Sequence, residues 1–168
     1  LATHGGSLRI YAKHRDDKVN EISPHVPKML ETEKRAGLLD PATYENFRAK
    51  IEATKRALLQ CLIDVKNEGK MIVGYGAPAK GNTLLNYYGI RTDFLDYTVD
   101  ANPNKQNLFL PGTHIPILHP DQIKIDKPEY ILILPWNIKE EIMEQLSYVH
   151  AWGGKFVIPI PELQVIDS

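Results

Sequence analysis

The stretch that decides the fold is "MIVGYGAPAKGNT", residues 71–83. An apolar run passes into closely spaced glycines, then into a lysine and a sequence typical of a helix start. Gly74, Gly76 and Ala79 match the G-x-G-x-x-G/A pattern of dinucleotide-binding turns. In such turns glycine lets the backbone approach a phosphate, and the free N–H groups at the helix start hold the anion. The pattern predicts an anion-binding turn; a tight strand-to-helix connection without a ligand is the alternative.

The same stretch departs from a dinucleotide turn at its centre. Pro78 removes one backbone donor. Lys80, Gly81 and Asn82 stand where apolar packing is usual, and because Gly81 rather than Ser or Thr follows the lysine, the stretch is no Walker-type turn. Lys80 suits a diphosphate as a point charge, and Asn82 can hydrogen-bond sugar or phosphate oxygens. These departures argue against NAD and leave other phosphate compounds open.

Strand and helix patterns alternate after residue 69. Apolar runs predict strands, and 3.6-residue periodicity predicts helices. Because the strands are apolar on both faces and separated by helices, they indicate a mainly parallel sheet covered on both sides. The expected fold is α/β and Rossmann-like, a mainly parallel sheet flanked by helices. The predicted strands are 71–76, 94–100, 114–118, 129–136 and 155–161, and the predicted helices are 79–88 and 137–149.

The chain before residue 70 predicts an extended and helical arm. We expect a strand at 7–12 and a short helix within 27–40 that ends near Gly37. Asp40-Pro41 reads as an N-cap followed by proline at the first helical position, opening a long amphipathic helix to about Asn67. The apolar residues at helical spacing on that helix are Phe47, Ile51, Leu58, Leu62 and Val65, and Gly69 closes it.

Composition narrows the classes of function. The 168 residues are 43% hydrophobic and 24% charged, as in a typical soluble domain, and the net charge of −1 argues against a nucleic-acid partner. No apolar stretch approaches the roughly 20 residues that span a bilayer, so we expect no membrane partner. The single cysteine, Cys61, excludes an internal disulfide and fits a reducing cytoplasm, the expected location. The six histidines lack metal-ligand spacing, so no metal site is predicted.

Polar side chains also follow two other predicted strands, at the edge where parallel sheets bind ligands. Asp100, Asn102 and Lys105 come after the second strand and could contact ribose or phosphate. Trp136 and Asn137 come after the fourth strand, and the tryptophan could stack on a base. The alternatives are structural. The Asp and Asn side chains could bond their own backbone in a turn, Asn137 could cap the next helix, and Trp136 could cover the edge of the core.

Histidines are further candidates near this edge. His114 lies on a loop, where a lone histidine is more often structural than catalytic, and His4 lies beside two glycines that could face a cleft. Cys61 is expected to be a small buried hydrophobe on the long helix rather than a nucleophile. No residue is assigned to catalysis. The residues expected to bind substrate are Gly74, Tyr75, Gly76, Lys80, Gly81, Asn82, Asp100, Asn102, Lys105, His114, Trp136 and Asn137.

Four separated motifs resemble one known unit, the C-terminal domain of the S-adenosylmethionine-dependent sugar C-methyltransferases. They are "GYGAPAKGNTLLNYYGI" (74–90), "DYTVDANPNKQNLFLPGTHIPI" (96–117), "ILILPWNIKEEI" (131–142) and "WGGKFVIPIPEL" (152–163). The resemblance runs from about residue 4 to residue 163. It implies an enzyme that methylates a carbon of a nucleotide-linked keto-deoxysugar. It also implies two upstream parts, a zinc-binding region and a domain that binds S-adenosylmethionine, with the sugar nucleotide in the cleft beside this domain.

The resemblance also implies a division of the chain. Residues 1–12 would be the end of the preceding methyltransferase domain, 13–69 a helical arm, and 70–168 the Rossmann-like C-terminal domain. The methyl-donor site and the catalytic base would lie upstream, so this chain alone is expected to be inactive and to need that upstream domain as its partner. Two alternatives stay open: an NAD-type oxidoreductase domain, which Pro78, Lys80 and the lack of a Tyr-x-x-x-Lys pair argue against, and a non-catalytic interaction domain.

Overall fold

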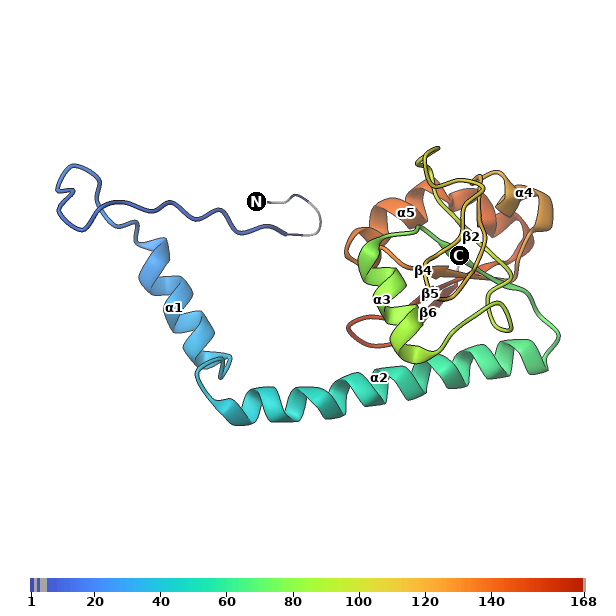
Figure 1. Ribbon diagram of the computed structural model, residues 1–168, viewed down its shortest axis with the longest axis horizontal. Coiled ribbons are helices and arrows are strands. Elements are labelled where there is room, and N and C mark those ends of the chain that lie inside the picture. The colour runs from blue at the N-terminus through green and yellow to red at the C-terminus, as the bar shows by residue number, and fades with distance from the viewer. Residues whose placement is uncertain (2, 4–5, 168) are drawn as a thin grey trace. The chain divides into compact units, whose positions relative to one another are not determined.

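The computed structural model describes residues 1, 3 and 6–167 of the chain (Figure 1). It divides into two compact units, Leu1–Glu52 and Ala53–Ser168. The division falls inside the long helix α2 (Pro41–Asn67), whereas the sequence suggested a boundary after residue 69. The physical reason is that the second half of α2 packs into the core of the second unit, with Leu58, Leu62 and Val65 buried.

The first unit contains helical segments, and none of its described residues is buried. It contains α1 (His25–Arg35) and the start of α2, where the carboxylate of Asp40 accepts the N–H of Ala42 at 3.0 Å, as the N-cap prediction requires. No residue of α1 is buried. The strand predicted at residues 7–12 is wrong for the described residues, which are irregular and exposed, because no strand lies beside them to complete a ladder.

The second unit is built on a six-stranded sheet in the order β3-β2-β1-β4-β5-β6. All neighbouring strands are parallel except β6, which runs antiparallel to β5. This order is that of the doubly wound dinucleotide-binding folds, so the Rossmann-like prediction is confirmed. The strands are β1 (Ile72–Tyr75), β2 (Thr98–Val99), β3 (Ile117–Leu118), β4 (Tyr130–Ile133), β5 (Lys155–Ile158) and β6 (Gln164–Asp167).

Helices cover both faces of the sheet, and the layers follow from alternation along the strands (Figure 1). On one face α2 and α3 (Ala79–Tyr88) bury side chains against Ile72 of β1 and Leu132 of β4. On the other face the short helices meet Val73 and Ile131, the neighbours of those residues. These helices are α4 (Gln122–Asp126), α5 (Lys139–Gln145) and the 3₁₀ turns η2 (Trp136–Ile138) and η3 (Ser147–Trp152).

Local signals predicted some elements well and others poorly. The helix at 79–88 has the predicted bounds, and strand β1 lies inside the predicted 71–76. The helix predicted at 137–149 is divided into η2, α5 and η3. Strand β6 and helix α4 were not predicted, because the edge strand is mostly exposed and the helix is only one turn long, so neither carries a full period of apolar residues.

Candidate functional site

The glycine turn lies where β1 ends and α3 begins. Gly76 has φ 86°, a left-handed conformation, and a Cβ added to it would lie 2.6 Å from the ring of Pro135. No other residue fits that position without strain. The neighbouring glycines serve close packing: a Cβ on Gly74 would meet the hydroxyl of Thr98 at 2.6 Å, and one on Gly81 would meet Leu134 at 2.8 Å. The pattern is therefore explained in part by the strand-to-helix connection itself.

The N-terminus of α3 still offers backbone donors. The first helical hydrogen bond runs from the N–H of Asn82 to the carbonyl of Pro78 at 3.0 Å. Among the described residues, the N–H groups of Ala79, Lys80 and Gly81 precede that bond and have no intrahelical acceptor. The positive end of the helix dipole points the same way. These donors can receive an anionic group.

Asp100, at the end of β2, is engaged by the chain itself. One carboxylate oxygen accepts the N–H of Ala77 at 2.7 Å, and the other accepts the N–H of Asn102 at 2.8 Å. Lys105 donates to the first oxygen at 3.2 Å and to the carbonyl of Ala77 at 3.0 Å. We call these three residues, Ala77, Asp100 and Lys105, the Asp100 latch. These hydrogen bonds fix the backbone of the turn at Ala77. They also engage Asp100, the acidic side chain whose position is that of the ribose ligand in a dinucleotide site.

Lys80 lies on the other side of the turn, toward the end of β4. Its ammonium donates to the side-chain oxygen of Asn137 and stands 4.8 Å from the centre of the Trp136 ring. Burial lowers the pKa of Lys80 from its ordinary value. The N-cap positions of η2 and α5 are Pro135 and Ile138, so Asn137 does not hold the N-cap position predicted for it, and its side-chain oxygen accepts from Lys80. Trp136 packs against the cores of both faces, as the structural alternative expected.

A groove of about 380 Å³ opens beside the turn. It is lined by residues 77–79 from the turn, Asn82 from α3, Lys105 from the latch, residues 108–111, and Ile117 from β3. Most of this surface is apolar, and Lys105 supplies the cation. Its position at the carboxyl ends of β1 and β2 is where open α/β sheets receive ligands.

The groove brings together only part of the predicted set. Lys105 and Asn82 line it, and the carboxylate of Asp100 bonds that lysine. Tyr75 points to the opposite face of the sheet, toward Gln145 of α5 at 3.4 Å, and its burial raises its pKa. Asn102 accepts the N–H of Asn104 at 3.0 Å, which confirms the expected turn. The binding roles themselves stay predictions.

Two histidine predictions end differently. His114 is exposed, with φ 59°, and its N–H donates at 3.0 Å to the carbonyl of Leu110, which is not a member of the predicted set. His4 lies outside the described residues. Cys61 is half-buried against the core, and burial raises the pKa of its thiol, in agreement with a packing role.

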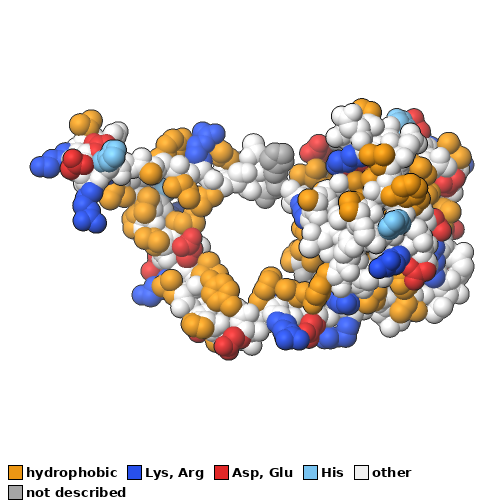
Figure 2. All heavy atoms as spheres, in the orientation of Figure 1, with side chains coloured by type: hydrophobic (Ala, Val, Ile, Leu, Met, Phe, Trp, Pro, Cys, Tyr) orange, Lys and Arg blue, Asp and Glu red, His pale blue; other side chains and the backbone are white. Residues whose placement is uncertain are grey.

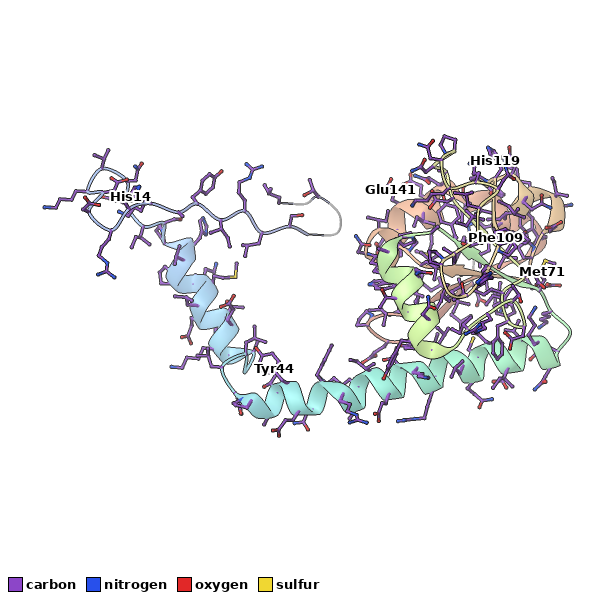
Figure 3. All side chains as sticks on the ribbon, viewed as in Figure 1. His14, Tyr44, Met71, Phe109, His119 and Glu141 are labelled. Carbon is purple, nitrogen blue, oxygen red and sulfur yellow. The ribbon has the colours of Figure 1, made fainter. Side chains whose placement is uncertain are left out.

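The sequence missed the outer wall of the groove. Leu108, Phe109 and Pro111 line it, and the side chain of Asn86 on α3 donates to the carbonyl of Pro111 at 3.0 Å. Phe109 is labelled in Figure 3, on the segment between β2 and β3. The available signal was the apolar run "LFLP" inside an otherwise polar loop.

Within residues 1, 3 and 6–167 no three metal-ligating side chains gather, and no helix is long and apolar enough to cross a membrane.

Comparison with known proteins identifies similar chains. A family model described as the C-methyltransferase C-terminal domain matches residues 2–161. C-methyltransferase NovU from Streptomyces niveus is 34% identical over 165 residues, which make up 98% of this chain and 39% of NovU. The chain therefore spans about two fifths of that relative. The crystal structure of UDP-D-quinovosamine 4-dehydrogenase from Vibrio fischeri aligns with a TM-score of 0.41 and 22% identity, covering 59% of this chain and 93% of that one.

Proposed function

The chain belongs to the C-methyltransferase C-terminal domain family, and we propose that it holds the nucleotide-linked sugar substrate of a methyltransferase that uses S-adenosylmethionine. The observation that carries this proposal is the groove of about 380 Å³ beside the open N-terminus of α3. Its volume is in the range of small-molecule sites. Its place at the carboxyl ends of the strands is that of ligand sites in related folds.

The charges around the turn suit a diphosphate. The N–H groups of residues 79–81 carry the positive end of the α3 dipole, roughly half an elementary charge. Lys80 and Lys105 add ammonium groups on the two sides of the turn. Lys105 uses two of its three N–H groups within the latch, which leaves one for a phosphate oxygen. Asn82 offers a further amide at the groove.

The methyl donor is assigned to the upstream domain. An adenosine cofactor in a Rossmann-like turn needs an acidic side chain for its ribose, and Asp100 already bonds Ala77, Asn102 and Lys105. These bonds argue against S-adenosylmethionine at this turn, and we assign the methyl transfer itself to the upstream domain. The relative NovU has more than half of its length outside the matched segment, room for such a domain. The chain alone is then inactive, and the domain that precedes it is its partner.

The same latch argues against the oxidoreductase alternative, because NAD makes the same demand on the acidic residue. Pro78 adds to this, since it lacks the N–H that would face a pyrophosphate. The non-catalytic interaction domain differs from the proposed function in one observable property, because such a domain would not bind a nucleotide-linked sugar.

Calorimetric titration of the 168-residue chain with dTDP, a dTDP-4-keto-sugar, S-adenosylmethionine and NADH tests the proposal. We expect binding of the two dTDP compounds only. Lys80→Ala should weaken it about tenfold, the loss of one charge-assisted contact. Lys28→Ala removes the same charge from the exposed surface of α1 and should change nothing.

Two results would contradict the proposal. Tight NADH binding would favour the oxidoreductase domain. If none of the four compounds binds, the non-catalytic interaction domain is favoured. The melting temperatures of Lys80→Ala and Lys28→Ala, measured alongside, check that both variants are folded.

A further inference from the structure

Helix α2 carries one apolar stripe that the described residues cover along only half of its length. Tyr44, Phe47 and Ile51 recur at spacings of three and four residues, so they lie on one side of the helix. The stripe continues on the same side through Leu58 and Leu62, which are buried in the core of the second unit. In the first half Tyr44 and Phe47 are each 59% exposed. The same side of one helix is therefore buried at one end and open at the other.

Helix α1 exposes a second apolar stripe. Val26, Met29 and Leu30 share one side of this helix and are 48%, 42% and 60% exposed. Exposed apolar side chains that gather in this way are typical of an interaction surface. We call the five residues Val26, Met29, Leu30, Tyr44 and Phe47 the arm face.

The turn between α1 and α2 holds the two stripes in a fixed arrangement. The hydroxyl of Thr43 donates to the carbonyl of Gly37 at 2.8 Å, and the hydroxyl of Tyr44 donates to the carbonyl of Leu38 at 2.7 Å. Tyr44 is labelled in Figure 3, where the two helices meet. Because these hydrogen bonds already order the turn, a partner that binds the arm face need not order it.

The loop before α1 determines which partner reaches the arm face most readily. Residues 13–24 join α1 to residues 1–12, the segment that the family resemblance assigns to the end of the preceding domain, and they span at most roughly 40 Å. The loop is shorter than this limit, because Lys13 donates to the carbonyls of Asp17 and Asn20, and the carboxylate of Asp17 accepts the N–H of Val19 at 2.8 Å.

A short connection favours a partner in the same polypeptide. It holds the preceding domain near the arm face at an effective concentration on the order of millimolar, about a thousandfold above that of a separate molecule at micromolar concentration. The surface that meets the arm face is apolar, because a charge buried there would find no counter-charge among these five side chains.

We propose that the arm face docks on an apolar surface of the domain that precedes this chain in the same polypeptide. This inference rests on the proposed function, which supplies the preceding domain, and deepens it by naming the surface through which that domain is held. Docking covers the open half of the α2 stripe. Both halves of α2 are then buried, the first against the preceding domain and the second in the core of the second unit.

Hydrogen exchange of α1 tests the proposal in the 168-residue chain and in the full-length protein that contains it. In the chain alone we expect almost no protection. In the full-length protein protection should rise at least about tenfold, because the arm must undock before its amides exchange. Phe47→Glu should return α1 to the level of the chain alone. Ala49→Glu is the matched control, because it places the same charge on the opposite, exposed side of α2 and should leave the protection unchanged.

Three results would overturn the proposal. The first is an α1 that is no better protected in the full-length protein than in the chain alone. The second is protection in the full-length protein that Phe47→Glu and Ala49→Glu leave equally intact. The third is a dimer of the 168-residue chain, seen by sedimentation at micromolar concentration and dissociated by Phe47→Glu, which would make a second copy the partner.

Two further measurements on the 168-residue chain keep these results interpretable. Phe47→Glu and Ala49→Glu should melt as the unaltered chain does, since both positions are exposed. The binding of dTDP tests the proposed function by itself, because the arm face does not line the groove. If dTDP binds and the arm face does not dock, only the docking surface is wrong.

Discussion

Residues 1–52 and residues 53–168 use similar local signals and reach different results. Both contain amphipathic helical sequence, yet every buried hydrophobic side chain of the described residues lies at or after Leu58. In the first unit Val26, Met29 and Leu30 stay exposed on one side of α1. Figure 2 shows hydrophobic side chains at the surface of the part of the chain that contains α1.

The difference teaches that helix signals and core formation are separate requirements. Asp40 caps the start of α2, but α1 has no side-chain cap at its start, and a helix of 11 residues is marginal in water by itself. The second half of α2 gains its stability from Leu58 and Leu62, which are buried against the sheet. The first unit has no comparable surface among its described residues.

The largest expected effect is on hydrogen exchange. We expect the amides of α1 to exchange with almost no protection, and those of β1 and β4 to be protected by at least about 10³, because the latter open only when the core unfolds. Exchange followed by mass spectrometry or NMR measures both. Protection of α1 equal to that of β4 would break the comparison, since it would require a stabilising surface in residues 1–52.

Substitutions along α2 compare the two units within one helix. Leu62→Ala should lower the free energy of unfolding by about 2–5 kcal/mol, because the residue is fully buried and a cavity remains. Phe47→Ala, in the first half of the same helix, should change the free energy of unfolding by less than about 0.5 kcal/mol, because Phe47 is exposed. Urea denaturation measures both. Equal effects would show that the first half of α2 is also packed.

Two glycines with left-handed backbone sharpen the account of the second unit. Gly69→Ala should cost about 1 kcal/mol, because φ is 71° but the space around it is open. Gly76→Ala has the same strain and a Cβ 2.6 Å from Pro135, so it should cost about 1–3 kcal/mol more. Thermal unfolding of the two variants gives the difference. If the two variants lose the same stability, the neighbours of Gly76, Pro135 above all, move aside for the added methyl group without cost.

A smaller effect is expected at high pH. Burial, and next the carboxylate of Asp126, raise the pKa of Tyr97, whereas a tyrosine of the unfolded chain ionises near pH 10. Above that pH the unfolded state releases a proton that the folded state keeps, so stability falls as the pH rises. Tyr97→Phe should remove this contribution, about 1.4 kcal/mol for each pH unit above 10.

The control for Tyr97→Phe is its stability at pH 7. No described residue stands in hydrogen-bond geometry with the buried hydroxyl of Tyr97, although the carboxylate of Asp126 is near enough to raise its pKa, so the substitution should cost little at pH 7. Denaturation curves at pH 7 and pH 11 supply both values. A slope between them that is the same with and without the hydroxyl would rule out a proton retained at Tyr97 in the folded state.

The sequence by itself determined the elements whose signals are local. The glycines and proline of the turn, followed by "AKGNTLLNYY", predicted α3 at its observed bounds, and Asp40-Pro41 predicted the start of α2. The apolar runs predicted β1 and β4, and their alternation with helices predicted the parallel sheet. Each of these signals lies within a few residues of the structure that it specifies, so no knowledge of distant contacts was needed.

Only the tertiary structure decided what the candidate site is made of. Asp100 and Ala77 are 23 residues apart in the chain, and Lys80 and Asn137 are 57 apart, so neither pairing has a local signal. The same holds for the wall of residues 108–111, which reaches α3 through Asn86, and for β6, whose partner is β5. The sequence named Asp100, Lys80 and Asn137 by their place after strands. Only folding brings Asp100 to the backbone of Ala77 and Lys80 to the side chain of Asn137. A buried charge or polar group is stabilised by whichever partner the packed chain brings within reach.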